Sequence, residues 1–204
     1  MILDDSGSSK TLSGKLLLAS PHLMEPTFRR TVLLLTNHTE DDGALGYILN
    51  RPLGKKVSDL MSDLEFPELG ELPAFIGGPV SQEHLTFGSL SWNEMGDELQ
   101  FSTHLSAQEA SRHLKEGFSV RAFVGYSGWS EGQLEGELEQ SAWVVKPPVP
   151  ELIPIDKLNV QLWGDLIRDV SPLHRLAAYQ PQDPHDALIL GSLSSAGHTL
   201  WLRQ

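Results

Sequence analysis

The stretch 124–143, VGYSGWSEGQLEGELEQSAW, contains the change of pattern that decides the fold. The apolar run 120–126 that leads into it is typical of a buried strand, and 131–139 is typical of an amphipathic helix. Between them, residues 128–132 read Gly-x-Ser-x-Gly, which in α/β-hydrolases marks a nucleophilic serine on a sharp strand-to-helix turn. The sequence therefore predicts such a turn around Ser130.

Two interpretations of Ser130 follow from its surroundings. Ser130 and Gln133 form a Ser-x-x-Gln capping box, in which each side chain bonds the backbone N–H of the other residue at the start of a helix. The alternative is a serine hydrolase with Ser130 or Ser127 as nucleophile, since aspartates and histidines follow in the Ser–Asp–His order of that fold. No His-Gly-Gly-Gly oxyanion motif precedes the stretch, so we favour the cap.

Length and composition are those of one ordinary globular domain. The chain has 204 residues, with 40% hydrophobic and 21% charged. We expect a loose tail over residues 1–12 and a single domain over 13–204. There is no cysteine, which excludes disulfides, thiolate metal sites and a cysteine nucleophile. The N-terminus lacks the features of a signal peptide, and no apolar run is long enough to span a membrane, so we expect a cytoplasmic protein.

Charge argues against direct binding of nucleic acid. The formal net charge is −12, from 15 Lys and Arg against 27 Asp and Glu. Affinity for DNA or RNA depends on neutralising phosphates with basic side chains, and no basic run here exceeds two residues. No helix-turn-helix pattern is visible. A direct DNA-binding regulator is therefore the weakest of the functional interpretations.

Strand and helix signals alternate along the chain. The predicted strands cover 15–19, 31–36, 44–50, 74–76, 85–92, 98–104 and 120–126. The predicted helices cover 57–64, a segment that begins at the Ser106–Glu109 capping box and stops at Gly117, 131–139, and 160–170. Residues 37–43 form a polar loop that ends in Asp-Gly, typical of a hairpin.

Three polar groupings are candidates for chemistry. His38 and the carboxylates up to Asp42 have a metal-binding composition but no metal-binding spacing, so a solvated loop is favoured and no metal or cofactor is predicted. Three glutamates, at 131, 135 and 139, form one helical stripe that faces water or a basic partner. Arg51 could bind a carboxylate or phosphate, or it pairs with a structural acid while Asn50 caps a turn.

Four blocks, in order, resemble the bacterial AlgH/YqgE family. They are Gly14–Pro21 with Pro26 and Phe28–Val32, then His38 with Gly43–Pro52, then Gly77–Val80, and finally Gly125-Tyr126, Trp129, Gly132–Leu134, Glu137 and Ala142-Trp143. The family pattern around the serine is G-Y-x-x-W-x-x-G-Q-L, in which the position of Ser130 is variable, and this weakens the nucleophile interpretation.

The resemblance implies an α/β (α+β) fold, a single domain whose mixed sheet is bent into a pseudo-barrel with helices packed outside. It implies no established enzyme activity, and the family name is linked to transcriptional regulation of exopolysaccharide synthesis. The chain departs from the family after the Gly-Gly-Pro-Val block, where it reads Leu85-Thr86 instead of Leu-His. Any role of that histidine is lost here.

The predicted function is that of a non-enzymatic binding or regulatory protein with a cleft for a protein or a small ligand. The alternatives are the hydrolase and, more weakly, the DNA-binding regulator. The cleft is expected where the family blocks meet. Its candidate residues are Asn50, Arg51, Pro52, Gly77, Gly78, Pro79, Gly125, Tyr126, Trp129 and Gln133.

Overall fold

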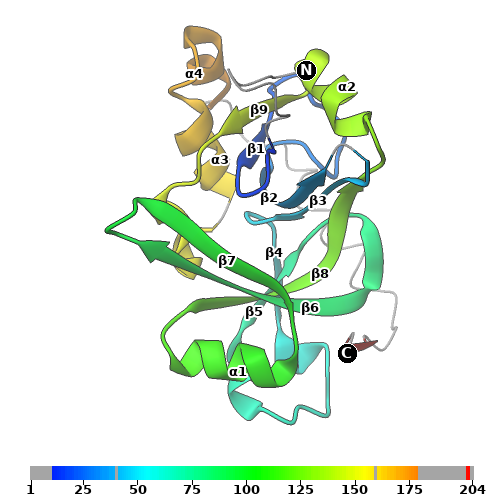
Figure 1. Cartoon of the computed structure of the whole chain (residues 1–204), viewed down its shortest axis with the longest axis vertical. Coiled ribbons are helices and arrows are strands. Elements are labelled where there is room, and N and C mark those ends of the chain that lie inside the picture. Colours follow the sequence, from blue (N-terminus) through cyan, green and yellow to red (C-terminus); the bar gives the residue numbers. More distant parts are fainter. Residues whose placement is uncertain (1–10, 40, 159, 179–200, 203–204) are drawn as a thin grey trace.

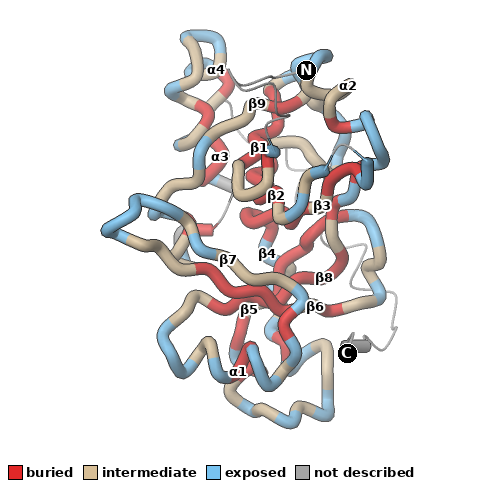
Figure 2. Tube along the Cα trace, viewed as in Figure 1, coloured by how far each residue is buried: buried red, intermediate tan, exposed pale blue. Residues whose placement is uncertain are grey.

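The computed structural model describes residues 11–39, 41–158, 160–178 and 201–202. Its core is a ten-stranded sheet with parallel and antiparallel neighbours, which curls into a half-barrel with four α-helices on its outside (Figure 1). Buried residues concentrate in the sheet, whereas the hairpin ends and the outer faces of the helices are exposed (Figure 2). The predicted single mixed α+β domain with a bent sheet is confirmed.

All seven predicted strands are present with shifted ends, and three further strands were not predicted. The strands are β1 (Leu16–Ala19), β2 (Val32–Thr39), β3 (Gly43–Ile48), β4 (Pro52–Lys56), β5 (Pro73–Ile76), β6 (Val80–Asn93), β7 (Glu98–Leu105), β8 (Ser119–Trp129), β9 (Trp143–Lys146) and β10 (Trp201–Leu202), of which β4, β9 and β10 are the ones that were not predicted. Because β2 continues to Thr39, the hairpin to β3 turns more tightly than the predicted loop 37–43. Strand β8 continues through Trp129, so the first two of the five residues of the Gly-x-Ser-x-Gly sequence lie within a strand.

Strand β8 joins the two halves of the sheet. Its first part pairs with β5 on one edge and β6 on the other, since Ala122 faces both Ala74 and Phe87. Its last part pairs with β3 over residues 127–129. The order β9-β1-β2-β3 then extends the upper half in Figure 1, and β4, β5, β6 and β7 form the lower half.

The chain crosses over β8 between β5 and β6. These two strands lie on opposite edges of β8, yet only residues 77–79 connect them. The crossing is a backbone-on-backbone contact: a Cβ atom on Gly78 would lie 2.3 Å from the Tyr126 carbonyl carbon, and one on Gly125 would lie 2.6 Å from the Val80 carbonyl oxygen. Gly125 also has φ +68°, where β8 bends from one half of the sheet into the other. The glycines of these blocks are therefore required by the crossing.

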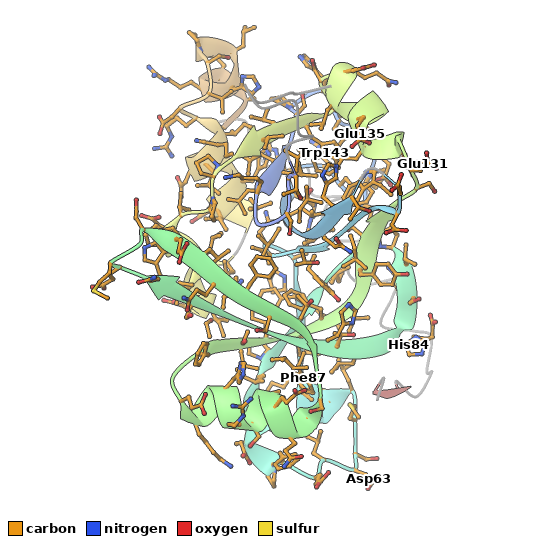
Figure 3. The ribbon with its side chains drawn as sticks, viewed as in Figure 1. Asp63, His84, Phe87, Glu131, Glu135 and Trp143 are labelled. Carbon is orange, nitrogen blue, oxygen red and sulfur yellow. The ribbon has the colours of Figure 1, made fainter. Side chains whose placement is uncertain are left out.

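The helices cover the sheet through three apolar clusters. They are α1 (Ala107–Lys115), α2 (Gln133–Glu139), α3 (Val160–Ile167) and α4 (Pro172–Ala178), with 3₁₀ turns at Val57–Asp59, Pro67–Glu71, Pro150–Leu152 and Ile155–Lys157. Helix α1 packs on the lower half, where Figure 3 shows Phe87 between the helix and the sheet, and α2 packs on the upper half through Leu134. Helices α3 and α4 cover the remaining cluster, and the indole N–H of Trp163 donates to the Ala19 carbonyl at 2.8 Å.

Helix α1 has the predicted ends. The Ser106 hydroxyl accepts the Glu109 N–H, and the Glu109 carboxylate accepts the Ser106 N–H at 2.9 Å, so both halves of the capping box are present. The helix ends before Gly117, whose φ of +88° suits a C-terminal stop. These local signals were readable in the sequence because both partners lie within one turn.

The predicted helix 57–64 is wrong. Residues Val57–Asp59 form a single 3₁₀ turn, and an irregular segment follows up to the next turn at Pro67. The Val57 N–H is already bonded to the Leu72 carbonyl at 2.9 Å, and the Asp59 side chain accepts the Lys56 N–H at 2.8 Å. These bonds fix only the first turn, and the two Ser-Asp pairs at 58–59 and 62–63 favour caps and turns over the interior of a helix. The apolar residues of the segment still pack under α1, so their spacing reflects burial of the segment and not a helical conformation.

The loop after this segment is held to α1 by Glu68. Its carboxylate lies 2.8 Å from the Lys115 ammonium and 2.5 Å from the Ser111 hydroxyl, and these bonds lower the pKa of Glu68 to about 2.

We expect Glu68→Gln to make the free energy of unfolding depend less on pH in the acid range. The lowered pKa contributes stability that is present above the unfolded value near 4.3 and is lost as pH falls toward 2.

Urea midpoints of wild type and Glu68→Gln between neutral pH and pH 2 would measure this difference. The two proteins should converge at the acid end of the range and separate above it. Curves that stay parallel across the whole range would show that Glu68 is not the linked group.

No helix among the described residues is long and apolar enough to cross a membrane.

Candidate functional site

A groove of about 450 Å³ lies on the outer end of the β2–β3–β8 surface. One row of registered positions crosses it, in which Asn37 on β2 faces Leu45 on β3 and Leu45 faces Gly128 on β8. The groove is lined by Asn37, Asp42, Gly43, Ala44, Leu45, Val80, Tyr126, Gly128, Trp129 and Ser130. Four separate segments of the chain thus meet at this one concave site.

The groove is hollow because its floor lacks a side chain at Gly128. This glycine is exposed, and a Cβ atom there would lie 3.3 Å from the Tyr126 ring. At the hairpin end, a Cβ atom on Gly43 would lie only 2.1 Å from the Trp129 carbonyl oxygen, so β3 and β8 approach each other closely at that point. Because neither glycine has a side chain, Gly43 allows the two strands to lie close together and Gly128 leaves the space of the groove unfilled.

The wall of the groove is apolar, and its rim is polar with a negative charge. Val80 is 37% exposed, an unusual value for valine in this protein, and it stands beside Tyr126. On the opposite side, the Asp42 N–H donates to the Thr39 hydroxyl at 3.0 Å, which fixes the turn that carries the Asp42 carboxylate. No Lys or Arg is among the lining residues.

Behind the groove, Glu137 on α2 joins the aromatic residues of the family motif. The indole N–H groups of Trp129 and Trp143 both donate to Glu137 Oε2, at 2.9 and 2.7 Å, and the Gln133 amide donates to Glu137 Oε1 at 3.0 Å. The two tryptophans are only 6% and 4% exposed, and their ring centroids lie 6.0 Å apart. This network fixes the Trp129 ring and, through it, the back of the groove.

Ser130 does not cap α2 with its hydroxyl, and this prediction is wrong. The helix begins at Gln133, its N-cap is Gly132 with φ +69°, and no side chain caps it. Only the reciprocal half of the box is present, since the Ser130 N–H donates to Gln133 Oε1 at 3.1 Å. The left-handed residue before the helix is Gly132, which takes this conformation at no steric cost, and the helix therefore starts past the serine.

Neither candidate serine has the surroundings of a nucleophile. Ser130 is exposed, and its hydroxyl bonds no histidine among the described residues. Ser127 is fully buried, and its hydroxyl donates to the Gly77 carbonyl at 3.2 Å. A serine nucleophile needs an adjacent general base and access for its substrate. In the described part of the chain, each serine lacks at least one of these.

His38 lies in β2 and connects α2 to the β2–β3 hairpin by hydrogen bonds. The prediction that His38 lies in a solvated loop is therefore wrong. The Nδ1 of His38 accepts the Leu12 N–H at 3.1 Å, so its Nε2–H donates to Glu135 Oε1 at 2.8 Å. Burial tends to raise the pKa of Glu135, but its hydrogen bonds with His38 and with its own backbone outweigh it and hold that pKa below its usual value. One member of the predicted glutamate stripe, Glu135, which Figure 3 labels on α2, is therefore engaged.

Asn50 and Arg51 hold a neighbouring backbone turn. Asn50 is fully buried, its Oδ1 accepts the Val32 N–H at 2.8 Å, and its amide donates to the Arg30 carbonyl at 2.9 Å. Arg51 is 7% exposed and donates to the Arg29 carbonyl. Pro52 begins β4 opposite Phe75. These contacts give the Asn-Arg-Pro block a structural role, because its side chains hold the backbone of residues 29–32.

The other candidate residues divide between the groove and its support. Tyr126 and Trp129 line the groove, and Gln133 bonds the glutamate behind it. Gly77, Gly78 and Gly125 form the crossing, and the exposed Pro79 leads into Val80 at the groove wall. Beneath the crossing, burial and then Tyr126 raise the pKa of Tyr47 to about 12, so this phenol is neutral.

Several lining residues are absent from the sequence-based set. Asn37, Asp42 and Leu45 join the groove through strand register, and Gly128 joins it because it has no side chain. Asp-Gly at the hairpin was a visible signal for the turn, but nothing in the sequence placed that turn beside Tyr126. Among the described residues, no group of three His, Asp or Glu side chains could hold a metal ion.

Comparison with known proteins agrees with the fold and the motifs. The AlgH-like family matches residues 16–173. A UPF0301 protein of Chlorobium phaeobacteroides is 33% identical over 190 residues, covering 86% of this chain and 95% of the relative. A UPF0301 protein of Mycolicibacterium smegmatis is 36% identical over 186 residues, covering 83% of this chain and 88% of the relative.

Two solved structures share the fold. The crystal structure of protein DIP2367 from Corynebacterium diphtheriae has a TM-score of 0.65 at 22% identity, covering 88% of this chain and 95% of that one. The solution structure of the AlgH protein from Pseudomonas aeruginosa has a TM-score of 0.58 at 26% identity, covering 90% of this chain and all of that one. With the family blocks gathered at the crossing and behind the groove, the chain belongs to the AlgH-like family.

Proposed function

We propose that this protein is a non-enzymatic binding or regulatory protein of the cytoplasm, and that its ligand occupies the groove over Gly128. The observation that carries the proposal is the convergence of four chain segments on one concave site with an apolar wall and a polar rim. Ligand sites in proteins are typically concave, largely apolar and preformed, with a few placed polar groups. This groove is open and its lining is about as polar as it is apolar, and its polar groups have fixed places in the strands and the turn.

Preorganisation supports the same function. The glutamate network holds the Trp129 ring from behind, and the hairpin turn at Asp42 is fixed by its bond to Thr39. Binding to a site whose side chains are already held loses less conformational entropy than binding to a mobile one. The residues of the family blocks thus hold the groove in shape, and the residues that line it are left to contact a ligand.

The test is to map fragment binding by amide NMR. We expect compounds from a diverse fragment library to shift the amides of Asn37, Leu45 and Gly128, and we expect Gly128→Val to abolish these shifts by filling the floor. Glu139→Gln, on the exposed end of α2, is the matched control and should leave the shifts intact. Fragments that shift other regions, or none at all, would contradict the proposal.

A fluorophosphonate probe tests the non-enzymatic part. We expect no labelling of the protein, because Ser130 has no base among the described residues and Ser127 is buried. Labelling that disappears in Ser130→Ala would replace the binding proposal with a hydrolase.

A further inference from the structure

The geometry points to an extended, basic peptide as the ligand, one that pairs as an added strand with the open edge of β8 and places a side chain in the groove. This inference rests on the proposed function and names the class of its ligand. Three independent features of the described residues support it: a strand edge, a floor without a side chain, and the charge of the rim.

The first feature is the edge of β8 opposite β3. Gly77 lies between β3 and β8, since its carbonyl accepts the Ile48 N–H and its N–H donates to the Val124 carbonyl, both at 2.9 Å. Strands β5 and β3 therefore share one edge of β8, and β6 occupies the other.

On the β6 edge, pairing ends early. The last pair is Val80 with Tyr126, although β8 continues to Trp129. Among the described strands, none pairs with residues 127–129 on that edge. Of these three residues Ser127 and Trp129 are buried and Gly128 is exposed, so the edge offers an extended peptide the backbone N–H and C=O groups of Gly128.

The second feature is the position of Gly128 beside that edge. Asn37, Leu45 and Gly128 are paired positions on three neighbouring strands. When a peptide adds as the next strand, its residue opposite Gly128 becomes the fourth position of this row. Because Gly128 has no side chain, the neighbouring residue of the peptide can lean over it into the groove, against Val80 and Tyr126. In strand addition, backbone bonds give affinity and such pockets give selectivity for alternate side chains.

The third feature is charge. Asp42 lines the groove, Asp41 precedes it in the turn, and Glu131 follows Ser130, which lies against Gly43 of the same turn; Figure 3 shows Glu131 pointing outward. All three are exposed, and no Lys or Arg is among the described residues that line the groove. On a protein with net charge −12, this rim favours a basic ligand and repels an acidic one.

The experiment uses three short fluorescent peptides and the full chain. The first alternates Val and Lys, the second alternates Val and Glu, and the third repeats the first with N-methyl groups on alternate residues, which removes the edge-pairing N–H groups. Fluorescence anisotropy gives their affinities. We expect the Val/Lys peptide to bind about tenfold or more tighter than each of the others, a difference of about 1.4 kcal/mol.

Two variants locate the site. Gly128→Val should abolish binding of the Val/Lys peptide, and Asp42→Asn, which keeps a side chain able to cap the turn, should weaken it several-fold. Glu139→Gln removes one carboxylate away from the groove and serves as the control for net charge. Equal affinity of the Val/Lys and Val/Glu peptides, or of the Val/Lys peptide and its N-methylated form, would overturn the inference.

The two proposals fail differently. If fragments occupy the groove while the Val/Lys peptide leaves the groove amides unshifted, the basic-peptide inference is wrong and the binding function stands. If neither fragments nor peptides shift those amides, both proposals are wrong.

Discussion

Replacing Gly125 by alanine is expected to lower the free energy of unfolding by about 4 kcal/mol, the sum of a backbone cost and a steric cost. The left-handed backbone at this residue costs about 1–2 kcal/mol for a side chain. Steric crowding adds roughly 1–3 kcal/mol, because the new Cβ atom would meet the Val80 and Gly78 carbonyl oxygens at 2.6 and 2.7 Å. Both contacts are with backbone, which cannot turn away as a side chain can. Urea denaturation of wild type and variant measures the difference.

Gly132→Ala is the matched control for Gly125→Ala. Gly132 has nearly the same φ, +69°, but a Cβ atom there would meet no atom within 4 Å. Its replacement should cost only the backbone term, about 1–2 kcal/mol. The difference between the two variants then isolates the crossing of residues 77–79 over β8. Equal losses would mean that the crossing relaxes freely and is not the reason for the glycine.

Glu137→Ala is expected to cost about 3 kcal/mol, the second largest loss. The change leaves the indole N–H groups of Trp129 and Trp143 without their acceptor, and a buried donor without a partner costs about 1–3 kcal/mol. Partial exposure of Glu137 admits water to the vacated space, which keeps the total below the sum of two full penalties. The measurement is again the free energy of unfolding in urea.

Glu139→Ala controls for helix propensity and net charge, because Glu139 lies on the same helix, is exposed, and should change stability little. A double-mutant cycle with Trp143→Phe sharpens the test. Phenylalanine removes the indole donor, so the cost of Glu137→Ala should be smaller in that background by about 1 kcal/mol. Strict additivity of the two changes would contradict the network.

Much of the fold was readable because its signals are local. Strand segments, the capping box at Ser106 and the stop at Gly117 each depend on neighbours within a few residues. The wrong helix at 57–64 shows the limit of that reasoning. Its apolar spacing was real, but it reflects the burial of these residues under α1, which is a tertiary contact and not a sign of helical geometry.

The candidate site was partly readable for the same reason. Trp129, Gln133, Glu137 and Trp143 all belong to the last family block, and Glu137, the common acceptor of the other three, lies on the same helix as Gln133. Asn37 joins the groove only through the registers of two strand pairs. The partner of His38, Glu135, lies 97 residues away in the sequence. Contacts of this kind are set by tertiary packing, which local patterns do not encode.

The crossing over β8 also constrains the order in which the protein can assemble. Strands β5 and β6 are consecutive in the chain, yet the strand that must lie between them is synthesised only after β7 and α1. Until residues 119–129 leave the ribosome, the lower half of the sheet has no central strand, and β5 and β6 cannot take their native edges. The two halves of the sheet can therefore form only after β8 is available. The entropy cost of closing the chain between β5 and β8 must be met before the contacts of β8 stabilise either half.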